Sequence, residues 1–351
     1  MNNSLNWEIE IISDWDEIYS IEFQKKWQKI VDEAYKPHVF FHPSLCLAWL
    51  DTYRTLRNLI PLFCVAKMGD TTLFLPLFLW KQNLKNAFRK IIVPVGFSDF
   101  DYHDPLVNTK LTPEELSAFL LAVTEKISSS LSYDEILVNG IHTDPDNNNL
   151  FLFEETAPYI DLKEFVDGDQ LLASIKNSVR GDLQRQIRRI ESTGEISLKE
   201  FKSTEEIFYH LDNFKKLHSN RWPDSYIAPN FLENLISRGF DSGIIDFTTL
   251  NAGHEIISYN LGFVYFGIYY YYMPVINPDY ENFSPGKIHL YYLIKRAIGY
   301  KYREFDFLRG NEKYKLDWTD KKRNLYIYKE YKKSVSSELK QFLISVKTRL
   351  N

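Results

Sequence analysis

The chain is poor in the residues that cross-link small proteins or anchor proteins in membranes. It has 2 cysteines in 351 residues, Cys46 and Cys64, and both lie in apolar segments, S-L-C-L-A-W and L-F-C-V-A. We therefore expect two buried thiols rather than a disulfide or a cysteine-rich metal site. No apolar run reaches the roughly 18 residues of a membrane-spanning helix, and the first residues lack the basic segment and apolar run of a signal peptide. These absences predict a cytoplasmic protein without a membrane partner.

The sequence also lacks a strong excess of one charge and the commonest nucleotide-binding spacings. The formal net charge is −5, which gives no reason to expect a nucleic acid as partner. Neither G-x-x-x-x-G-K-[ST] nor G-x-G-x-x-G occurs, so nucleoside triphosphate hydrolysis and nicotinamide chemistry are disfavoured. The spacings H-x-x-x-H and D-x-D-x-D-G are missing too, and no metal site or tightly bound cofactor is expected.

The composition and the order of elements indicate two α/β domains. With 44% hydrophobic and 25% charged residues, the chain is globular and long enough for about two domains of roughly 100–200 residues each. Each half runs from helices through a β-meander to a helix and a strand, and no linker rich in Gly, Ser or Pro separates the halves. We expect two tandem domains with mixed sheets, flanking helices and a cleft between them. The predicted division is 1–165 and 166–351; the last strand and helix are expected to close one of the sheets, and the helix is a candidate to pack back on the first domain.

Hydrophobic periodicity and capping residues place the individual elements. Thr112-Pro113-Glu114-Glu115, for example, has the N-cap, the Pro and the Glu that open a helix, and Met68-Gly69-Asp70 is typical of a hairpin turn. The predicted helices are 15–35, 42–56, 112–131, 167–193, 203–222, 229–238, one opening at 284 and 334–350. The predicted strands are 59–66, 71–80, 91–95, 134–140, 195–201, 242–249, 255–264, 266–276, 304–308 and 325–331.

A candidate anion site lies where the aromatic strand 266–276 leads into Ser284-Pro285-Gly286. The first N–H groups of a helix lack partners and carry the positive end of the helix dipole, so a helix that opens behind a strand can cradle a phosphate. We predict a phosphate or pyrophosphate cradle at Phe283–Lys287. Pro and Gly before a helix are also ordinary punctuation, and that alternative stays open.

A second basic feature is the predicted helix K-N-S-V-R-G-D-L-Q-R-Q-I-R-R. Between 176 and 189 it carries five positive charges and one negative charge, away from an apolar stripe. Lys176 and Arg180 are candidates for binding a diphosphate, because arginine binds phosphate oxygens through paired N–H groups. The alternative is a solvated face that pairs with acidic residues.

The loop Ser98–Pro105 is the first candidate for proton transfer. It holds Asp99, Asp101, His103 and Asp104 directly after a strand, and carboxylates and imidazoles orient hydroxyl groups or accept a proton from an amine. Asp104-Pro105 is equally compatible with a simple turn.

Further candidates lie in the second half of the chain. Asp306 lies between Phe305 and Phe307 in a predicted strand, so it faces opposite to both, toward a cleft or a basic partner. Arg309, Tyr314 and Lys315 follow that strand, at the end where α/β folds usually place their chemistry. His218 and Arg221 lie together at the end of a predicted helix, although a lone histidine is more often structural.

In combination, these motifs resemble those of the bacterial GNAT-like acyltransferases, which are related to CelD-type cellulose-biosynthesis proteins and to the FemABX nonribosomal peptidyltransferases. Over about 165–320 the resemblance rests on the basic helix, L-H-x-x-R-W, N-P-x-Y, S-P-G and D-F-x-R-G-x-E-x-Y-K-x-x-W. In the first half it rests on F-H-P-S, L-P-L and G-x-S-D-x-x-x-x-D-P.

The resemblance implies a twinned acetyltransferase-like fold in which an acyl thioester lies between two splayed strands. By this resemblance, Phe283–Lys287 holds the donor's pyrophosphate, although S-P-G is shorter than the Gly-rich loop of GNAT proteins. Lys176 and Arg180 match basic positions that hold the acceptor's diphosphate, and Asp99 or Asp101 lies near the acceptor amine. Acyl-CoA is then a co-substrate.

The activity that this implies is transfer of a short acyl group, such as acetyl or 3-hydroxybutyryl, from acyl-CoA to a nucleotide-linked amino sugar. The sugar is expected to be a dTDP-linked aminodideoxyhexose of O-antigen or capsule biosynthesis. The proton acceptor is expected among Asp99, Asp101, His103 and Asp306. Two alternatives remain: an aminoacyl-tRNA-dependent peptidyltransferase of the FemABX type, which the net charge disfavours, and a non-catalytic module of polysaccharide assembly.

Overall fold

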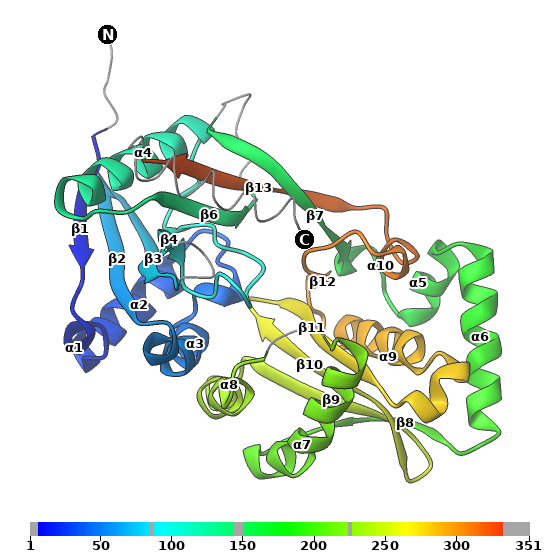
Figure 1. Cartoon of the computed structure of the whole chain (residues 1–351). Coiled ribbons are helices and arrows are strands. Elements are labelled where there is room, and N and C mark those ends of the chain that lie inside the picture. The colour runs from blue at the N-terminus through cyan, green and yellow to red at the C-terminus, as the bar shows by residue number, and fades with distance from the viewer. Residues whose placement is uncertain (1–5, 84–87, 143–149, 224–226, 333–351) are drawn as a thin grey trace, which may run out of the picture. The chain divides into compact units, whose positions relative to one another are not determined.

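The computed structural model describes residues 6–83, 88–142, 150–223 and 227–332 (Figure 1). The chain divides into two compact units: unit 1 comprises Met1–Glu155 with Asn324–Asn351, and unit 2 comprises Thr156–Arg323. Both boundaries fall inside strands, β7 (Phe151–Asp161) and β13 (Lys322–Tyr331). The division expected from the sequence, at 165/166, lies further along the chain and gives the C-terminal segment to the second domain. The helix expected at 334–350 lies outside the described residues.

Unit 1 is a sheet with helices. Its strands follow the order β1-β2-β3-β4-β6-β13-β7, and β5 pairs with β3 on the side. The other elements of the unit are β1 (Glu8–Ile12), α1 (Trp15–Ile18), α2 (Ile21–Glu33), the 3-10 helix η1 (Val39–Phe41), α3 (Pro43–Leu56), β2 (Leu59–Met68), β3 (Thr71–Lys81), β4 (Lys90–Pro94), β5 (Leu106–Val107), α4 (Pro113–Ser130) and β6 (Glu135–Ile141).

Aromatic packing holds α2 and α3 on this sheet. Trp27 of α2 is completely buried, and its ring centroid lies 5.4 Å from that of Phe63 and 5.2 Å from that of Phe74. Trp49 of α3 stacks on Phe78 at 5.3 Å. Large aromatic side chains bury much apolar area each, so this layer supplies a large part of the unit's hydrophobic stabilisation.

Unit 2 has the strand order β7-β12-β11-β10-β9-β8. Its β9–β10 and β10–β11 pairs are antiparallel, whereas β11 and β12 run parallel. The other elements are the 3-10 helix η3 (Leu162–Glu164), α5 (Gly168–Ser174), α6 (Asn177–Glu191), β8 (Ile196–Glu200), α7 (Thr204–Arg221), α8 (Phe231–Gly239), β9 (Ile245–Ala252), β10 (Glu255–Tyr265), β11 (Ile268–Ile276), the 3-10 helix η4 (Pro278–Phe283), α9 (Pro285–Gly299), β12 (Glu304–Asp306) and α10 (Lys313–Leu316).

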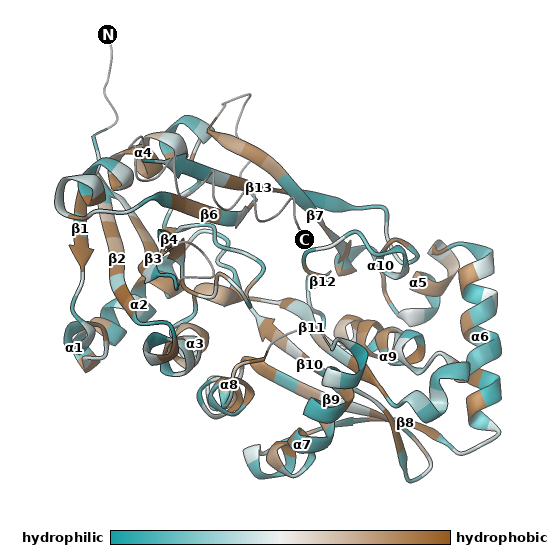
Figure 2. Ribbon diagram, viewed as in Figure 1, coloured by the Kyte–Doolittle hydropathy of each residue, from teal (hydrophilic) through white to brown (hydrophobic). Residues whose placement is uncertain are grey.

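Helices cover both faces of the unit 2 sheet. His289 of α9 reaches Thr248 of β9, whereas Phe214 of α7 packs on Phe247 and Tyr259. Neighbouring residues of a strand point to opposite faces, so α9 and α7 lie on opposite faces. In Figure 2 hydrophobic segments alternate with paler or hydrophilic ones along β9 and β10, while α6 is mainly hydrophilic.

Two helices predicted as continuous are interrupted. In the first, α1 ends at Ile18, and Ser20 caps α2 because its Oγ accepts the Phe23 N–H at 3.1 Å. In the second, Ile175 and Lys176 take extended backbone angles between α5 and α6. The apolar periodicity continues across both breaks, so it does not reveal them. Within the described ranges, no helix combines the length and the hydropathy that a membrane span requires.

Candidate functional site

The strands β11 and β12 separate after three paired residues. Their parallel register runs only from Ile268 opposite Glu304 to Tyr270 opposite Asp306, whereas β11 continues along β10 to Ile276. On its other side β12 pairs with β7, and after Asp306 the chain continues along β7: the Phe307 N–H donates to the Pro158 carbonyl at 3.0 Å. Residues 271–276 therefore form a strand edge that no described strand pairs on the β12 side. Such an edge offers backbone N–H and C=O groups to an extended ligand.

The 3-10 helix η4 and the N-terminus of α9 lie directly behind this edge. Ser284 caps α9 in the left-handed conformation with φ 52°, and Pro285 follows at the first helical position. Ser284 N–H donates to the Glu281 carbonyl and Lys287 N–H to the Ser284 carbonyl. The Gly286 N–H is the first-turn donor to which no described residue is hydrogen-bonded. At Phe283–Lys287 the structure thus has a turn with one open donor, which offers fewer N–H groups than a Gly-rich loop, and its role as a pyrophosphate cradle stays a prediction.

The lack of a side chain at Gly286 matters for this turn. A Cβ at this position would lie 3.2 Å from Cγ2 of Ile276, the last residue of β11. That separation is tighter than an ordinary van der Waals contact, so glycine allows the helix start to approach the end of the strand closely.

The basic helix α6 lies against the same turn. Lys287 Nζ donates to Asp182 Oδ2 at 2.7 Å, and Asp182 also pairs with Arg185. These partners hold the pKa of the Asp182 carboxyl below its usual value, the hydrogen bond from Lys287 most of all. Arg189 Nη1 donates to the Asn282 carbonyl at 3.0 Å. The basic helix and the Ser284-Pro285-Gly286 turn, which the sequence analysis treats separately, are therefore neighbours in unit 2.

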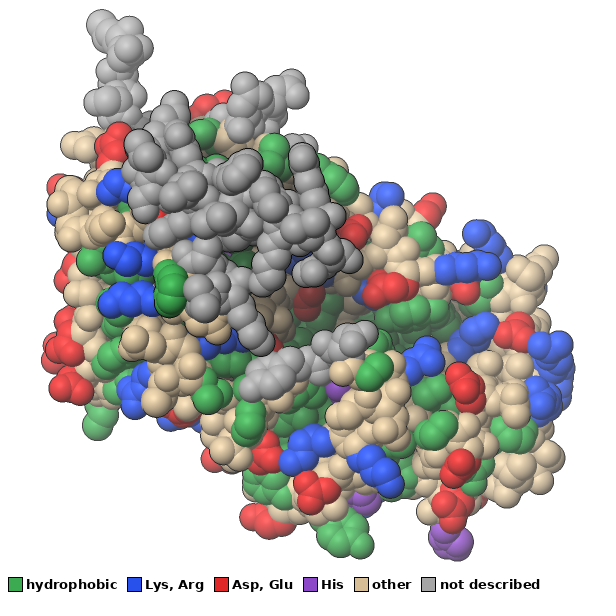
Figure 3. Space-filling model, in the orientation of Figure 1, with side chains coloured by type: hydrophobic (Ala, Val, Ile, Leu, Met, Phe, Trp, Pro, Cys, Tyr) green, Lys and Arg blue, Asp and Glu red, His purple; other side chains and the backbone are tan. Residues whose placement is uncertain are grey.

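The two residues predicted to hold the acceptor's diphosphate lie at the start of α6. Lys176 is exposed at the N-cap position, and Arg180 Nη2 donates to Asn177 Oδ1 at 2.8 Å. Figure 3 shows Lys and Arg side chains gathered over this helix, at the right-hand edge of the view. Their role as diphosphate ligands stays a prediction.

Arg221, at the end of α7, also reaches this region. Its Nη1 lies 3.7 Å from Glu281 Oε1 in η4, so α6 and α7 both contact the segment between β11 and α9. His218, one turn earlier, is 5% exposed, and its ring lies 4.9 Å from that of Trp222. Burial lowers the pKa of His218. Its Nδ1 is buried without a hydrogen-bond partner among the described residues.

Asp306 belongs to a buried ionic cluster at the end of the β11–β12 pairing. Its Oδ1 accepts the Leu308 N–H at 2.7 Å, and its Oδ2 lies 3.4 Å from Arg323 Nη1. Arg323 also pairs with Glu304. Burial, and next the charge of Asp306, raise the pKa of Glu304, while Arg323 opposes them. Asp306 thus faces opposite to Phe305 and Phe307, as the alternation predicts, and has the basic partner that the sequence left as one alternative.

The side chains that follow β12 differ in their exposure to solvent. Lys315 is 4% exposed, and its Nζ donates to the Arg309 carbonyl at 2.6 Å and pairs with Glu312 at 2.9 Å. Tyr314 is 41% exposed. Lys315 therefore stabilises the turn after β12, and the exposed Tyr314 ring is accessible to a ligand.

In unit 1, the Asp99 carboxylate joins α3 to the loop after β4. It accepts hydrogen bonds from Trp49 Nε1 at 2.7 Å, Tyr53 OH at 3.1 Å and Ser98 Oγ at 2.5 Å. Burial raises the pKa of Asp99, and these donors, together with the Arg57 charge, oppose that rise. The arrangement stabilises the loop, while the partly exposed carboxylate keeps its raised basicity.

The other two predicted residues of this loop lie against β6. His103 is completely buried, and its Nδ1 lies 3.0 Å from the Asn139 carbonyl. Asp101 is half-buried. Its backbone carbonyl oxygen would lie only 2.2 Å from a Cβ at Gly140, so glycine is required there for the loop to approach β6. Complete burial leaves the His103 ring no surface for a substrate in this state. The roles predicted for Asp99, Asp101 and His103 stay predictions.

Asp104 of the same loop pairs with His142, which directly follows β6, and the sequence did not indicate this pair. Asp104 Oδ2 lies 2.5 Å from His142 Nδ1, and Asp104 Oδ1 accepts the His142 backbone N–H at 2.8 Å. The two residues lie 38 positions apart, and no local spacing connects them. The only hint in the sequence is their position: Asp104 lies in the loop after the predicted strand 91–95, and His142 comes shortly after the predicted strand 134–140.

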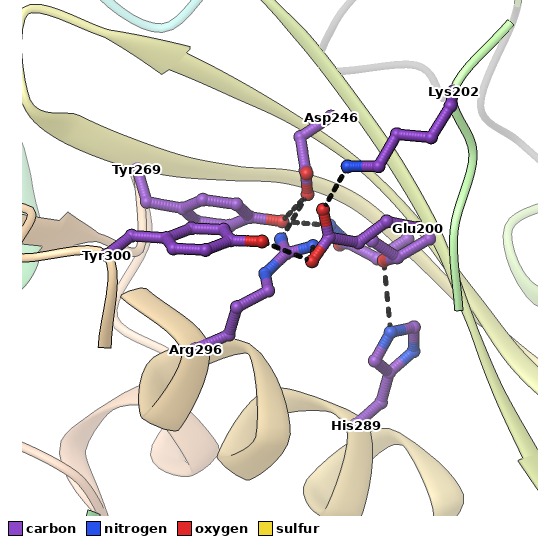
Figure 4. A network of polar contacts seen from close by, with 9 residues as sticks. Glu200, Lys202, Asp246, Tyr269, His289, Arg296 and Tyr300 are labelled. Atoms are coloured by element: carbon purple, nitrogen blue, oxygen red, sulfur yellow. Dashed lines mark hydrogen bonds and ion pairs between the residues drawn. The ribbon is translucent and has the colours of Figure 1, made fainter. Parts of the chain in front are cut away.

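A buried polar network fixes α9 to the sheet in unit 2 (Figure 4). Arg296 Nη2 donates to Asp246 Oδ2 at 2.6 Å, and Nη1 lies 3.4 Å from Glu200 Oε1. Asp246 also accepts from Tyr269 OH at 2.7 Å, and Glu200 accepts from Tyr300 OH at 2.8 Å. The network orients α9 and therefore the turn at its N-terminus. Among all the residues that the structure describes, no group of three or more His, Cys, Asp or Glu side chains is arranged to hold a metal ion.

Comparison with known proteins supports this description of the fold. Residues 177–316 match the model of the family described as "Acetyltransferase (GNAT) domain". No curated protein matches the chain significantly.

Among solved structures, FemX is similar at a TM-score of 0.62 and 12% identity, over 95% of this chain and 99% of that one. The C-terminal domain of a putative lysylphosphatidylglycerol synthetase from Agrobacterium fabrum is similar at 0.53 and 10%, over 93% and 95%. A tandem GNAT protein from the clavulanic acid biosynthesis pathway is similar at 0.50 and 10%, over 93% and 98%.

The strand separation, the turn before α9 and the family match lie within the same part of the chain. The expected α/β class with GNAT-like domains is confirmed. Residues 177–316 are similar to the GNAT acetyltransferase domain family, and the chain has the fold of tandem GNAT proteins.

Proposed function

We propose that the protein is a GNAT-type N-acyltransferase whose acyl-CoA donor lies along the open edge of β11. The observation that carries this proposal is the separation of β12 from β11 after Asp306, directly in front of the turn that opens α9. The pantetheine arm of the donor then pairs with residues 271–276 as an added strand does. Its pyrophosphate accepts a hydrogen bond from the Gly286 N–H. The positive end of the α9 dipole and the nearby cations Lys287 and Arg189 stabilise its negative charge.

The chemistry needs no covalent enzyme intermediate. An acceptor ammonium loses one proton, and its nitrogen attacks the thioester carbonyl carbon. The new C–N bond forms, the nitrogen loses a second proton, and the C–S bond breaks. The thiolate takes up one of these protons and the other passes to solvent. Backbone N–H groups of the β11 edge are suited to stabilise the oxyanion, and alignment of the two substrates supplies much of the acceleration.

For the acceptor, the proposal is a nucleotide-linked amino sugar, with dTDP-linked aminodideoxyhexoses as the class to test first. A diphosphate in the acceptor matches the exposed Lys176 and the half-buried Arg180, the cationic side chains at the start of α6. Arg221 and the exposed Tyr314 are further candidates for contacts with the nucleotide or sugar.

The test compares ligands that share parts of the donor. CoA is expected to raise the melting temperature of the purified protein, because a ligand of the native state stabilises it. Pantetheine, which lacks the pyrophosphate, is expected to raise it less. Acyl transfer is then measured by thiol release from acetyl-CoA and 3-hydroxybutyryl-CoA with dTDP-amino sugars as acceptors. A protein that neither CoA nor a nucleotide sugar stabilises would refute the acyltransferase proposal.

A pair of glycine substitutions on one helix tests the turn itself. Gly286→Ala places a Cβ 3.2 Å from Ile276 at the open donor, whereas Gly299→Ala, at the other end of α9, meets nothing within 4 Å. Alanine keeps the backbone N–H, but its Cβ pushes the turn away from Ile276 and so misaligns that donor. A charge-assisted hydrogen bond is worth about 1.5–3 kcal/mol, so we expect the affinity for CoA to fall roughly tenfold or more in Gly286→Ala. Calorimetric titration of both variants measures this. Equal affinities in the two would remove the pyrophosphate from this turn.

The second candidate is an aminoacyl-tRNA-dependent peptidyltransferase. The similarity to FemX over nearly the full length of both chains favours keeping it. This candidate predicts tRNA binding that weakens steeply as salt rises and no stabilisation by CoA. A protein that binds a nucleotide sugar but neither donor would instead be a non-catalytic module of polysaccharide assembly.

A further inference from the structure

An ion pair between α6 and α9 lies directly beside the turn at Ser284–Gly286. Lys287 is the third residue of α9, and its Nζ donates to Asp182 Oδ2 at 2.7 Å. No other described residue accepts a hydrogen bond from this ammonium. Among the residues that the structure describes, Asp182 is therefore the group that holds the positive charge of Lys287 in place.

The Asp182 carboxylate has a second cationic partner. Its Oδ1 accepts from Arg185 Nη2, three residues later on the same helix. The two cations hold the pKa of Asp182 below its usual value, Lys287 most of all, so the carboxylate is ionised near pH 7. Because Arg185 stays on Oδ1, Asp182 can release Lys287 without becoming an unpaired carboxylate.

The pair of Asp182 with Lys287 is accessible from solvent. The two side chains are 29% and 26% exposed. The next residue on α6, Leu183, is completely buried in the core that α6 and α9 share. The helix behind Asp182 is thus fixed by packing, whereas the charged groups can meet a ligand. An ion pair of this exposure contributes up to about fivefold to an equilibrium constant.

Arg189, the other cation near the turn, is held in a different way. Its Nη1 donates to the Asn282 carbonyl at 3.0 Å and to Gln186 Oε1 at 2.7 Å, and its guanidinium carbon lies 5.0 Å from the centroid of the Phe283 ring. These three partners are uncharged. Of the two cations, only Lys287 is held by an acidic side chain of the described chain, so only its availability depends on a carboxylate.

We propose that Asp182 competes with the pyrophosphate of the donor for Lys287 and thereby speeds the release of CoA, an inference that rests on the proposed acyltransferase function. A phosphate oxygen on the same ammonium brings a second negative charge to it, and the two anions repel each other. While the donor is bound, Lys287 pairs with the pyrophosphate and Asp182 keeps Arg185. When CoA leaves, Asp182 takes Lys287 back, so the departing product leaves no unpaired cation behind.

The test compares two substitutions that each remove one negative charge. Asp182→Asn removes the competing charge at nearly constant size, so we expect the Kd for CoA to fall about three- to fivefold. Affinity differences between related complexes lie mainly in the dissociation rate, so CoA should leave more slowly by a similar factor in stopped-flow displacement. Pantetheine, which has no phosphate, should bind equally to both proteins. Asp212→Asn is the matched control, since Asp212 is an exposed carboxylate of α7 that pairs with Lys215 at 3.1 Å.

A double-mutant cycle shows whether the effect passes through Lys287. In a Lys287→Met background, Asp182→Asn should tighten CoA binding by less than about twofold, because the cation for which the two anions compete is gone. The gain in the single variant should also shrink as salt rises, since partly exposed charges are screened.

Three results separate this inference from the proposed function. Unchanged or weaker CoA binding in Asp182→Asn would overturn the competition and leave the acyltransferase proposal in place. The same holds for a gain of equal size in the Lys287→Met background. If neither CoA nor a nucleotide sugar stabilises the unaltered protein, the proposed function fails and this inference fails with it.

Discussion

Arg296 illustrates how one buried cation organises unit 2. Its side chain is 9% exposed and lies between the Asp246 and Glu200 carboxylates, with Tyr269 and Tyr300 on the same acids. A buried ion pair often adds little stability compared with an apolar replacement of the whole group. Removal of one partner is different, because it leaves the opposite charge buried and uncompensated.

We therefore expect Arg296→Met to lower the free energy of unfolding by about 3–5 kcal/mol, since it leaves the buried Asp246 carboxylate without its cation, whereas Glu200 keeps its contact with Lys202. Urea unfolding followed by circular dichroism measures this. Lys295→Met, at the exposed preceding position on α9, is the matched control and should stay within about 0.5 kcal/mol of the unaltered protein. Equal losses in the two variants would mean that the network of Figure 4 contributes no stability.

At the scale of single residues, the sequence predicts the type of partner better than the partner itself. Alternation places Asp306 opposite to Phe305 and Phe307, and the structure supplies Arg323 from β13 as its cation. Nothing local to Asp306 indicates Arg323. The Asp104–His142 pair is harder still, because sheet formation alone brings its two segments together.

Among the helices, α3 begins with an unusual cap. His42 is its N-cap residue, and Nδ1 accepts the Ser44 N–H at 3.3 Å. Only a neutral imidazole can accept this bond. Burial lowers the pKa of His42 to about 4, although Asp32 opposes the shift. The hydrogen bond that caps α3 is therefore lost when His42 is protonated.

This cap predicts a change of stability with pH. Between pH 6.5 and about 4 the unfolded chain binds a proton at His42 that the native protein does not, so the free energy of unfolding falls as pH falls. One such group contributes about 1.4 kcal/mol per pH unit in that window. His42→Asn keeps a capping acceptor but does not titrate, so its slope should be smaller by about that amount. Urea unfolding at several pH values tests this, and parallel slopes would contradict it.

The elements show where sequence patterns are sufficient. The capping box of α4 is present as predicted, because Thr112 and Glu115 each bond the other's backbone. The hairpin around Gly69 pairs Met68 with Thr71. In contrast, no strand was predicted at β7, whose F-L-F-E-E-T-A-P-Y-I-D lacks strict alternation and contains charges and a proline. Its place between other strands is a tertiary effect that local propensity does not encode.

For the whole molecule, the two units have different spectroscopic probes. Of the 7 tryptophans, unit 2 contains Trp222 and Trp318, and the other five lie in unit 1. We expect CoA to stabilise the unfolding transition reported by the unit 2 tryptophans, by about 2.7 kcal/mol at a concentration one hundred times its Kd.

The experiment replaces the unit 1 tryptophans with phenylalanine in one variant and those of unit 2 in another. Fluorescence-detected urea unfolding of both, with and without CoA, then reports each unit. An equal shift in both variants would indicate a single cooperative transition, and a shift confined to unit 1 would place the donor there. Each variant also needs circular dichroism as a check that it folds.

In the candidate site too, residue spacing along the chain indicates some contacts, and others are seen only in the folded structure. The turn at Ser284–Gly286 was readable because strand, turn and helix are contiguous. The contact of this turn with Asp182 and Arg189 was not, because those residues lie about one hundred positions earlier and helix periodicity says only that they face away from the apolar stripe.

The division of unit 1 between the two ends of the chain has a consequence for biosynthesis. A ribosome completes all of unit 2 before it delivers the part of β13 that belongs to unit 1, in which Tyr326–Tyr331 pair with β6. Until then, β6 is paired on one side, with β4, over two register positions. Although N-terminal domains usually fold first during synthesis, here the later-encoded unit is the first to have its full sequence outside the ribosome. The nascent chain thus carries an unfinished sheet edge for as long as unit 2 is being made.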